Sequence, residues 1–201
     1  MTYALPAGPR PAPRRQLFIS TAMVVVAGTM LMGGMLSVWL RFRAAAPTRP
    51  TSDGLRQIKD WLPADLKMPE VVTNVGLLSF LVMCVMVQWA AYAARRGDSK
   101  HVVSALGLTL LFGIAILNAQ AAIFVQFNVG VASGAYQSMF YAIVGTLTVL
   151  IVSGLVFTVA SLFKSIGGRA ANTDLLNSHA LDCYFLAAAY TAVWFVVFVQ
   201  K

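Results

Sequence analysis

The feature that most constrains this chain is a series of five apolar stretches, each long enough to cross a lipid bilayer. They cover residues 17–40, 71–93, 102–127, 139–163 and 181–199. A helix needs about 20 mainly apolar residues to span the hydrocarbon, and its backbone groups must be hydrogen-bonded within the segment. The composition agrees, because 59% of the residues are hydrophobic and only 11% are charged. The sequence therefore predicts an all-α integral membrane bundle of five transmembrane helices.

The segments between these stretches are too short to form a second domain. We therefore expect one membrane domain over residues 17–201, preceded by a basic tail at residues 1–16 whose proline, alanine and arginine content predicts disorder. A cleaved signal peptide is disfavoured, because the first apolar stretch is too long and is followed directly by Arg41 and Arg43.

The basic residues lie at the ends of the apolar stretches. The net charge is +8, but no soluble module carries it, so the charge indicates helix orientation and contact with anionic lipid headgroups rather than nucleic-acid binding. With the N-terminus in the cytoplasm, eight of the fifteen lysines and arginines lie inside and seven outside. This small bias predicts a multi-pass plasma-membrane protein with a cytoplasmic N-terminus.

The connector between the first two stretches contains a possible short helix. Apolar side chains recur on one helical face within residues 53–62, up to Trp61 and Leu62. This pattern predicts an interfacial helix with Trp61 at the level of the lipid headgroups, and Trp39 is a second expected interface anchor. A solvated loop that docks on a partner is the alternative interpretation.

Residues that could carry chemistry are few. Ionisable side chains inside a membrane mark ion paths and catalytic sites, and none lies well inside a predicted span. His101 borders the third stretch, His179 precedes the fifth, and Asp182 stands at its start. A haem or copper centre needs several converging ligands, and Cys84 and Cys183 lack the spacing of a metal site or a disulfide framework. We expect no catalytic residue, no metal site and no cofactor.

The polar residues that we single out within the spans are neutral. Interhelical hydrogen bonds worth about 0.6 kcal/mol each are their ordinary role, and a lined substrate path is the alternative. These residues are Asn74, Gln88, Asn118 and Gln120.

Small residues recur at close spacing, which lets membrane helices approach one another or a partner. The expected packing positions are Gly33, Gly34, Ala90, Ala94, Gly154, Thr158, Ala188 and Ala192.

The most distinctive string in the chain is QWAAYAARRGD, at residues 88–98. It resembles the end of a span and the Arg-Arg-Gly-Asp turn of bacterial haem-copper (cytochrome c) oxidase subunit III, in its five-helix form. Here the turn is Arg95, Arg96, Gly97 and Asp98. Residues 32–43, 134–141 and 193–198 resemble further segments of this family in the same order, and the resemblance covers about residues 15–201.

The chain departs from this family at the buried ionisable positions. Apolar, small or neutral residues stand there instead: Gly28 or a neighbour, Ile123, Leu147, Leu150, Ala188 and Thr191. The resemblance also implies a groove between the first two helices and the last three. It thus implies a divergent member that keeps the helix-packing scaffold.

Subunit III, as the resemblance implies, carries no haem or copper, flanks the catalytic subunit, binds lipid and supports sustained proton uptake and turnover. The resemblance therefore implies a non-catalytic accessory subunit in aerobic electron transport, with catalytic subunit I (and II) and membrane lipids as partners. An accessory subunit of a nitric-oxide reductase is one alternative. A stand-alone small transporter or sensor is another, although no proline interrupts any span, unlike in many transporter folds.

Overall fold

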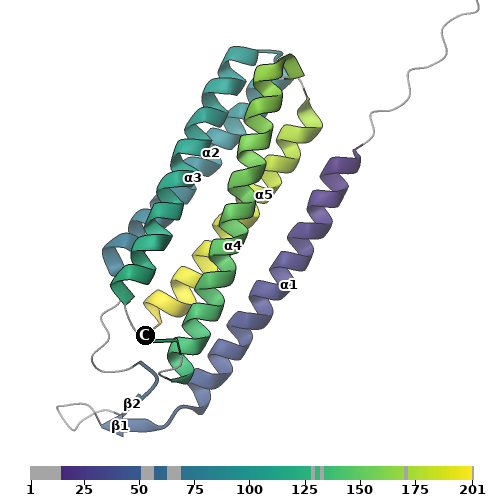
Figure 1. The fold of residues 1–201 in the computed structure, drawn as a ribbon. Helices are drawn as coiled ribbons and strands as arrows, with labels where there is room; N and C mark the ends of the chain where they lie inside the picture. Colours follow the sequence, from purple (N-terminus) through teal and green to yellow (C-terminus); the bar gives the residue numbers. More distant parts are fainter. Residues whose placement is uncertain are drawn as a thin grey trace, which may run out of the picture.

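Five long helices make up most of the protein (Figure 1). The computed structural model describes residues 15–50, 57–62, 69–127, 130–131, 134–169 and 172–200. Within these residues, five helices are long and apolar enough to cross a membrane, which confirms the predicted five-helix membrane bundle. They are α1 (Gln16–Ala45), α2 (Glu70–Arg95), α3 (Ser99–Phe127), α4 (Ala135–Lys164) and α5 (Thr173–Val193). The π-helical segment η2 (Trp194–Val199) extends α5, and η1 (Ser165–Arg169) follows α4 but leaves helical backbone geometry at Gly167 and Gly168.

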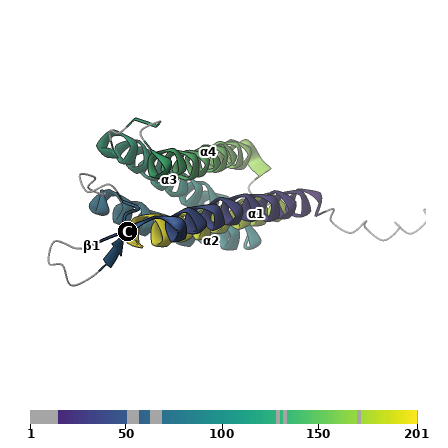
Figure 2. The same cartoon turned by 90° about the horizontal axis from the view of Figure 1, so that it is seen from below.

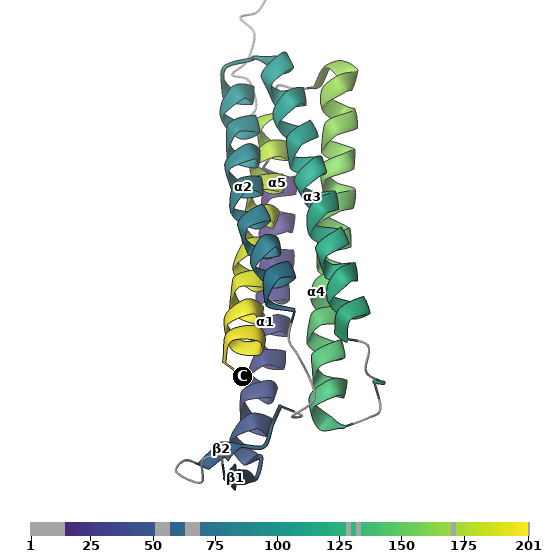
Figure 3. The same ribbon diagram turned by 90° about the vertical axis from the view of Figure 1, so that its left-hand side faces the viewer.

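The helices form two layers (Figure 2). Helices α3 and α4 lie side by side in one layer, and α5 lies between α1 and α2 in the other. Helices α1, α3 and α5 begin at the end of the bundle where α2 and α4 finish (Figure 3). We call this the N-terminal end of the bundle, and the opposite end, near the chain's C-terminus, the C-terminal end.

The expected grouping of the first two helices against the last three is wrong. Helix α1 packs mainly against α5 and to a smaller extent against α4, whereas α2 packs against α3 and α5. Gly28 permits the close approach of α1 to α5, because a Cβ atom at this position would lie 2.5 Å from the Cζ atom of Phe185. An aromatic ring of α5 thus covers this glycine of α1.

The first connector contains a short hairpin where we expected an interfacial helix. Strand β1 (Thr48–Pro50) pairs antiparallel with β2 (Gln57–Lys59), so the helix prediction is wrong for residues 57–59, while residues 53–56 lie outside the described part of the chain. Prolines favour extended backbone, and the Lys59 ammonium donates to the carbonyls of Ala44 (2.8 Å) and Ala46 (3.1 Å), at the C-terminal end of α1. A cation at a helix C-terminus is favourable.

The turn between α2 and α3 ends one helix and begins the next. Gly97 has a φ of +73° and its N–H donates to the Ala94 carbonyl, while the Asp98 N–H donates to the Ala93 carbonyl. A glycine in this left-handed conformation is a common helix terminator. The Asp98 carboxylate then accepts the His101 backbone N–H at 3.2 Å, as an N-cap residue does. The glycine of the Arg-Arg-Gly-Asp string therefore ends α2, and its aspartate caps the start of α3.

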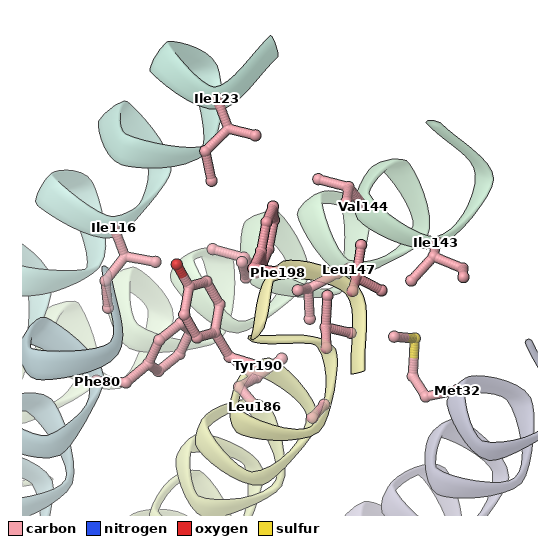
Figure 4. Close-up of a cluster of buried hydrophobic side chains, with 14 of the residues drawn as sticks. Met32, Phe80, Ile116, Ile123, Ile143, Val144, Leu147, Leu186, Tyr190 and Phe198 are labelled. Carbon is pink, nitrogen blue, oxygen red and sulfur yellow. The ribbon is translucent and has the colours of Figure 1, made fainter. Parts of the chain in front are cut away.

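Buried apolar side chains from all five helices fill the interior (Figure 4). Met32 reaches this cluster from α1, Phe80 from α2, Ile116 from α3, Leu147 from α4 and Leu186 from α5. Ile123, also from α3, belongs to the same cluster.

Candidate functional site

Helix α5 begins at Thr173, whereas the apolar pattern placed the start of the fifth span at residue 181. Asn172 accepts the Leu175 N–H at 3.2 Å and so caps this earlier start. Because α5 starts earlier than predicted, His179 and Asp182 lie two to three turns inside a helix that is long and apolar enough to cross a membrane. Our expectation that no ionisable residue lies well inside a span is therefore wrong.

His179 is completely buried between α4 and α5. Its Nε2 atom lies 3.3 Å from the Thr158 hydroxyl, and both ring nitrogens lie 3.8 Å from the Cys183 sulfur. The ring also packs against Phe157, with centroids 5.1 Å apart. The imidazole thus contacts the Thr158 hydroxyl and the Cys183 sulfur at the interface of α4 and α5.

Asp182 lies one turn further along α5 and is partly exposed. Its Oδ2 atom is buried and has no hydrogen-bond partner, and the buried hydroxyl of Ser161 in α4 also has none. A Cβ atom at Gly154 would lie 3.1 Å from this carboxylate oxygen. Gly154 therefore gives the Asp182 carboxyl room against α4.

A signal for this polar interface is present in the sequence but was missed. His179, Asp182 and Cys183 stand at i, i+3 and i+4, and Thr158, Ser161 and Ser165 follow a similar spacing, so each set lies on one helical face. The hydropathy pattern began the fifth span at residue 181, after His179, so the first set was not recognised as one helical face.

A polar recess opens between α1, α2 and α5 at the N-terminal end of the bundle. Its volume is about 530 Å³. Tyr184 donates to the Gln88 side-chain oxygen at 2.7 Å, and Arg95 donates to Asn177 at 3.2 Å. Its lining comprises Arg15, Phe18, Gln88, Arg95, Thr173, Asp174, Asn177, Ala180, Leu181 and Tyr184. Two guanidinium groups beside apolar side chains suit an amphipathic anion, since basic pockets between membrane helices bind anionic headgroups.

The two tryptophans that we predicted as interface anchors pack on each other at the C-terminal end. Trp39 and Trp61 meet edge to face with ring centroids 5.2 Å apart, and both contact Tyr136. Trp39 is only 1% exposed and Trp61 only 8%. These rings join α1, the first connector and α4, and their role as membrane anchors stays a prediction.

The predicted packing residues fall into buried and exposed groups. Ala90 and Ala94 are buried in a cluster that α2 shares with α3, and Gly154 and Thr158 are buried against α5. The exposed members are Gly33, Gly34, Ala188 and Ala192. The exposed group is free for lipid or another protein, and its use as a contact surface stays a prediction.

The four neutral polar residues have different environments. Asn74 accepts from the Trp194 indole at 2.8 Å, and Gln88 accepts from Tyr184. Gln120 is 1% exposed with an unpartnered side-chain oxygen, whereas Asn118 is exposed. They therefore do not form one shared polar path across the bundle.

The two histidines do not meet. His101 lies at the N-terminal end, where its Nδ1 atom is 2.6 Å from the Asp98 carboxylate and its ring faces Trp89. His179 is enclosed between α4 and α5. Within the described ranges, no group of three or more histidine, cysteine, aspartate or glutamate side chains is arranged to hold a metal ion.

Comparison with known proteins identifies one family. The family described as Cytochrome c oxidase subunit III matches residues 14–200. The chain is 27% identical over 192 residues to a probable cytochrome c oxidase subunit 3 of Rickettsia bellii, an alignment that covers 92% of this chain and 68% of the relative.

Other relatives carry the same description. The chain is 26% identical over 156 residues to the probable cytochrome c oxidase subunit 3 of Rickettsia felis, covering 76% of the chain and 55% of the relative. It is 22% identical over 162 residues to cytochrome c oxidase subunit 3 of Bos taurus, covering 78% of the chain and 58% of the relative. The chain thus spans between about half and two thirds of the length of these relatives.

Proposed function

Because this chain belongs to the cytochrome c oxidase subunit III family, we propose that it is a non-catalytic accessory subunit of a respiratory haem-copper oxidase in a bacterial plasma membrane. The observation that carries this proposal is the family match over residues 14–200, together with five membrane-spanning helices. The chain supports the assembly, lipid binding and sustained turnover of its catalytic partner, and the partner holds the redox centres.

The partner surface that we propose includes α1. Only 22% of the most apolar window of α1 is buried within the chain, the lowest share among the five helices. Gly33 and Gly34 are exposed, and a Cβ atom at either position would meet nothing within 4 Å. Exposed small residues let a helix of catalytic subunit I, or of subunit II, approach the α1 backbone closely.

The lipid site that we propose is the polar recess between α1, α2 and α5. Arg15 and Arg95 bind the phosphate of an anionic phospholipid, and the acyl chains follow the apolar side chains of Phe18 and Leu181 along α1 and α5. This arrangement is consistent with a cytoplasmic N-terminus, because anionic headgroups of the inner leaflet attract basic residues. Reporter fusions at the two termini test this orientation.

Comparing native membranes with and without this chain tests the proposed accessory role. Membranes that lack this chain should keep the haem spectrum of the oxidase, since the chain holds no redox centre in this account. Their oxygen consumption should begin normally and then decline during turnover faster than in complete membranes. Unchanged sustained oxygen consumption at equal oxidase content would contradict the proposed function.

A further inference from the structure

A second recess lies at the C-terminal end of the bundle, where α1 ends and α4 begins (Figure 3). Its volume is about 560 Å³, which is in the range of small-molecule sites. Helix α1 contributes Phe42 and Ala45 to its lining, the first connector contributes Asp60 and Trp61, and the start of α4 contributes residues 134–137. We call it the connector recess.

The first turn of α4 has backbone donors that no side chain caps. Gly134 is the N-cap residue, and a glycine offers no side-chain oxygen to accept an N–H of the first turn. No described residue accepts the backbone N–H of Ala135 or Gln137. Because α4 is 30 residues long, these donors lie at the positive end of a long helix dipole, which favours an anion.

Two buried polar side chains of the lining also lack a partner. Gln137 is 7% exposed, and no described residue forms a hydrogen bond with its side-chain amide. Trp61 is 8% exposed, and its indole N–H has no acceptor in the described part of the chain. Leaving a buried donor unpaired is costly, so both side chains indicate that the recess holds a hydrogen-bond acceptor.

The charged groups beside the recess are also favourable to an anion. Asp60 is the acidic residue of the lining, and its carboxylate pairs with the Arg49 guanidinium at 3.2 Å. The Lys59 ammonium lies next to Ala45, because it donates to the carbonyls of Ala44 and Ala46. Two cations therefore stand against one carboxylate, and the connector side of the recess has a net positive charge.

The α1 side of the recess is apolar. Phe42 and Ala45 are exposed, and Val38, one turn before Phe42, is exposed as well. These side chains continue from the recess toward the middle of α1, a helix that is apolar enough to cross a membrane. A ligand with an anionic head and one aliphatic chain therefore fits, with its head at α4 and its chain along α1.

We propose that the connector recess binds an aliphatic carboxylate, such as the anion of a long-chain fatty acid. The carboxylate accepts hydrogen bonds from the first turn of α4, the Gln137 amide and the Trp61 indole, and the chain lies on Phe42 and Val38. This site is separate from the phospholipid recess proposed above, which lies at the other end of the bundle. It goes beyond the accessory role and does not depend on which oxidase the chain joins.

Tryptophan fluorescence tests the site in the full chain, purified in detergent at mildly alkaline pH, where a fatty acid is ionised. Trp89→Phe and Trp194→Phe together leave Trp39 and Trp61 as emitters. Stearate that carries a nitroxide near its carboxyl group should quench this emission to a plateau, and unlabelled stearate should restore it. Quenching that rises without a plateau, as simple partition into the micelle gives, would overturn the proposal.

The chemistry of the head group is tested with two further probes labelled at the same place in the chain. The methyl ester of the labelled stearate has a carbonyl oxygen but no charge, and labelled phosphatidylglycerol has a phosphate and two chains. Neither should quench to a plateau over the concentration range of the fatty acid. A plateau with either probe at the same affinity as the fatty acid would overturn the assignment to an aliphatic carboxylate.

Gly134→Asp tests the helix terminus. The new carboxylate can cap the first turn of α4, and the φ of 170° at Gly134 is open to any residue. The variant should raise the apparent Kd for labelled stearate about tenfold or more, without lowering the thermal midpoint. Gly134→Ala is the matched control, because it adds the same Cβ atom, 2.7 Å from the flexible end of Gln137, but no carboxylate. Equal binding by the two variants would overturn the assigned site.

Trp61→Phe tests the indole donor. It keeps a ring beside Trp39, whose centroid lies 5.2 Å from that of Trp61, but removes the N–H. The Kd for labelled stearate, reported by Trp39, should rise, and an unchanged Kd would overturn the role of Trp61. Because these experiments use the chain alone, their failure would leave the oxidase assignment intact, and failure of the oxidase assignment would leave this site intact.

Discussion

Tyr190 of α5 donates a hydrogen bond from its hydroxyl to the backbone carbonyl of Thr73 in α2, over a distance of 2.9 Å. The two residues are 117 positions apart in the sequence. The ring reaches this carbonyl by passing over Gly76, where a Cβ atom would lie 2.9 Å from the Tyr190 Cζ atom. The hydrogen bond thus fixes the position of α5 against α2 at a point where α2 has no side chain.

Gly76→Ala should destabilise the bundle. The added methyl group collides with the Tyr190 ring, which is 1% exposed and has little space to move into. Overpacking of this kind costs about 1–3 kcal/mol, so the thermal midpoint in detergent should fall. Gly107→Ala is the matched control, because a Cβ atom there meets nothing within 4 Å. A midpoint for Gly76→Ala equal to that of Gly107→Ala would contradict the close contact.

Gly97→Ala should destabilise the α2–α3 turn through the backbone alone. A Cβ atom at Gly97 meets nothing within 4 Å, but φ is +73°, and an L-residue other than glycine pays about 1–2 kcal/mol in that region. Gly97→Asn should cost less, since asparagine tolerates the left-handed conformation. Thermal unfolding of both variants checks this order, and an alanine variant as stable as the wild type would refute it.

Asp98→Ala should destabilise the protein in a pH-dependent way. The His101 backbone N–H and then the His101 side chain donate to the Asp98 carboxylate, and these hydrogen bonds hold its pKa below the ordinary value. A lowered pKa in the folded state gives stability that is complete above the unfolded pKa and is lost as the pH falls through the folded pKa. Unfolding midpoints of wild type and variant should therefore converge in acid.

The control for this titration is Asp98→Asn, which keeps an oxygen able to accept the His101 N–H but removes the charge. It should be more stable than Asp98→Ala near neutral pH. If the wild type and Asp98→Ala keep the same difference in midpoint throughout the acid range, the carboxylate is not the group that stabilises the turn.

Gly154→Leu should impair folding of the chain, whereas Gly34→Leu should impair its assembly with the oxidase. Gly154 faces Leu186 and Asp182 within the chain, so a leucine there should disturb α4–α5 packing and lower the yield of folded protein. A side chain at Gly34 meets no atom of this chain. Gly34→Leu should therefore fold normally and reduce recovery of the oxidase complex, as measured by size-exclusion chromatography. Normal complex recovery with Gly34→Leu would count against α1 as the partner surface.

The sequence predicts the five helices well because long apolar stretches in a bilayer have few structural alternatives. It also predicts the Arg95–Asp98 turn as a distinctive unit, although only the structure explains its glycine and aspartate. Hydropathy is a property of one segment, so it predicts where a helix can meet lipid. It does not predict which polar residues another helix will cover.

The start of α5 illustrates this limit. Ser178 and His179 look like connector residues because they are polar, yet both are completely buried, and Thr158 of α4 contacts the imidazole. The helix prediction for the first connector is wrong for a related reason. Trp61 fits a helical stripe by spacing, but its position follows from contacts with Trp39 and Tyr136, which are distant in sequence.

Purification of the tagged chain from its native membrane in a mild detergent tests the central claim most directly. A haem-copper oxidase catalytic subunit should co-purify with it, identified by mass spectrometry and by a reduced-minus-oxidised haem spectrum. A nitric-oxide reductase catalytic subunit in its place would assign the chain to that alternative complex. Recovery of the intact chain alone, with no haem-bearing subunit, would contradict the account.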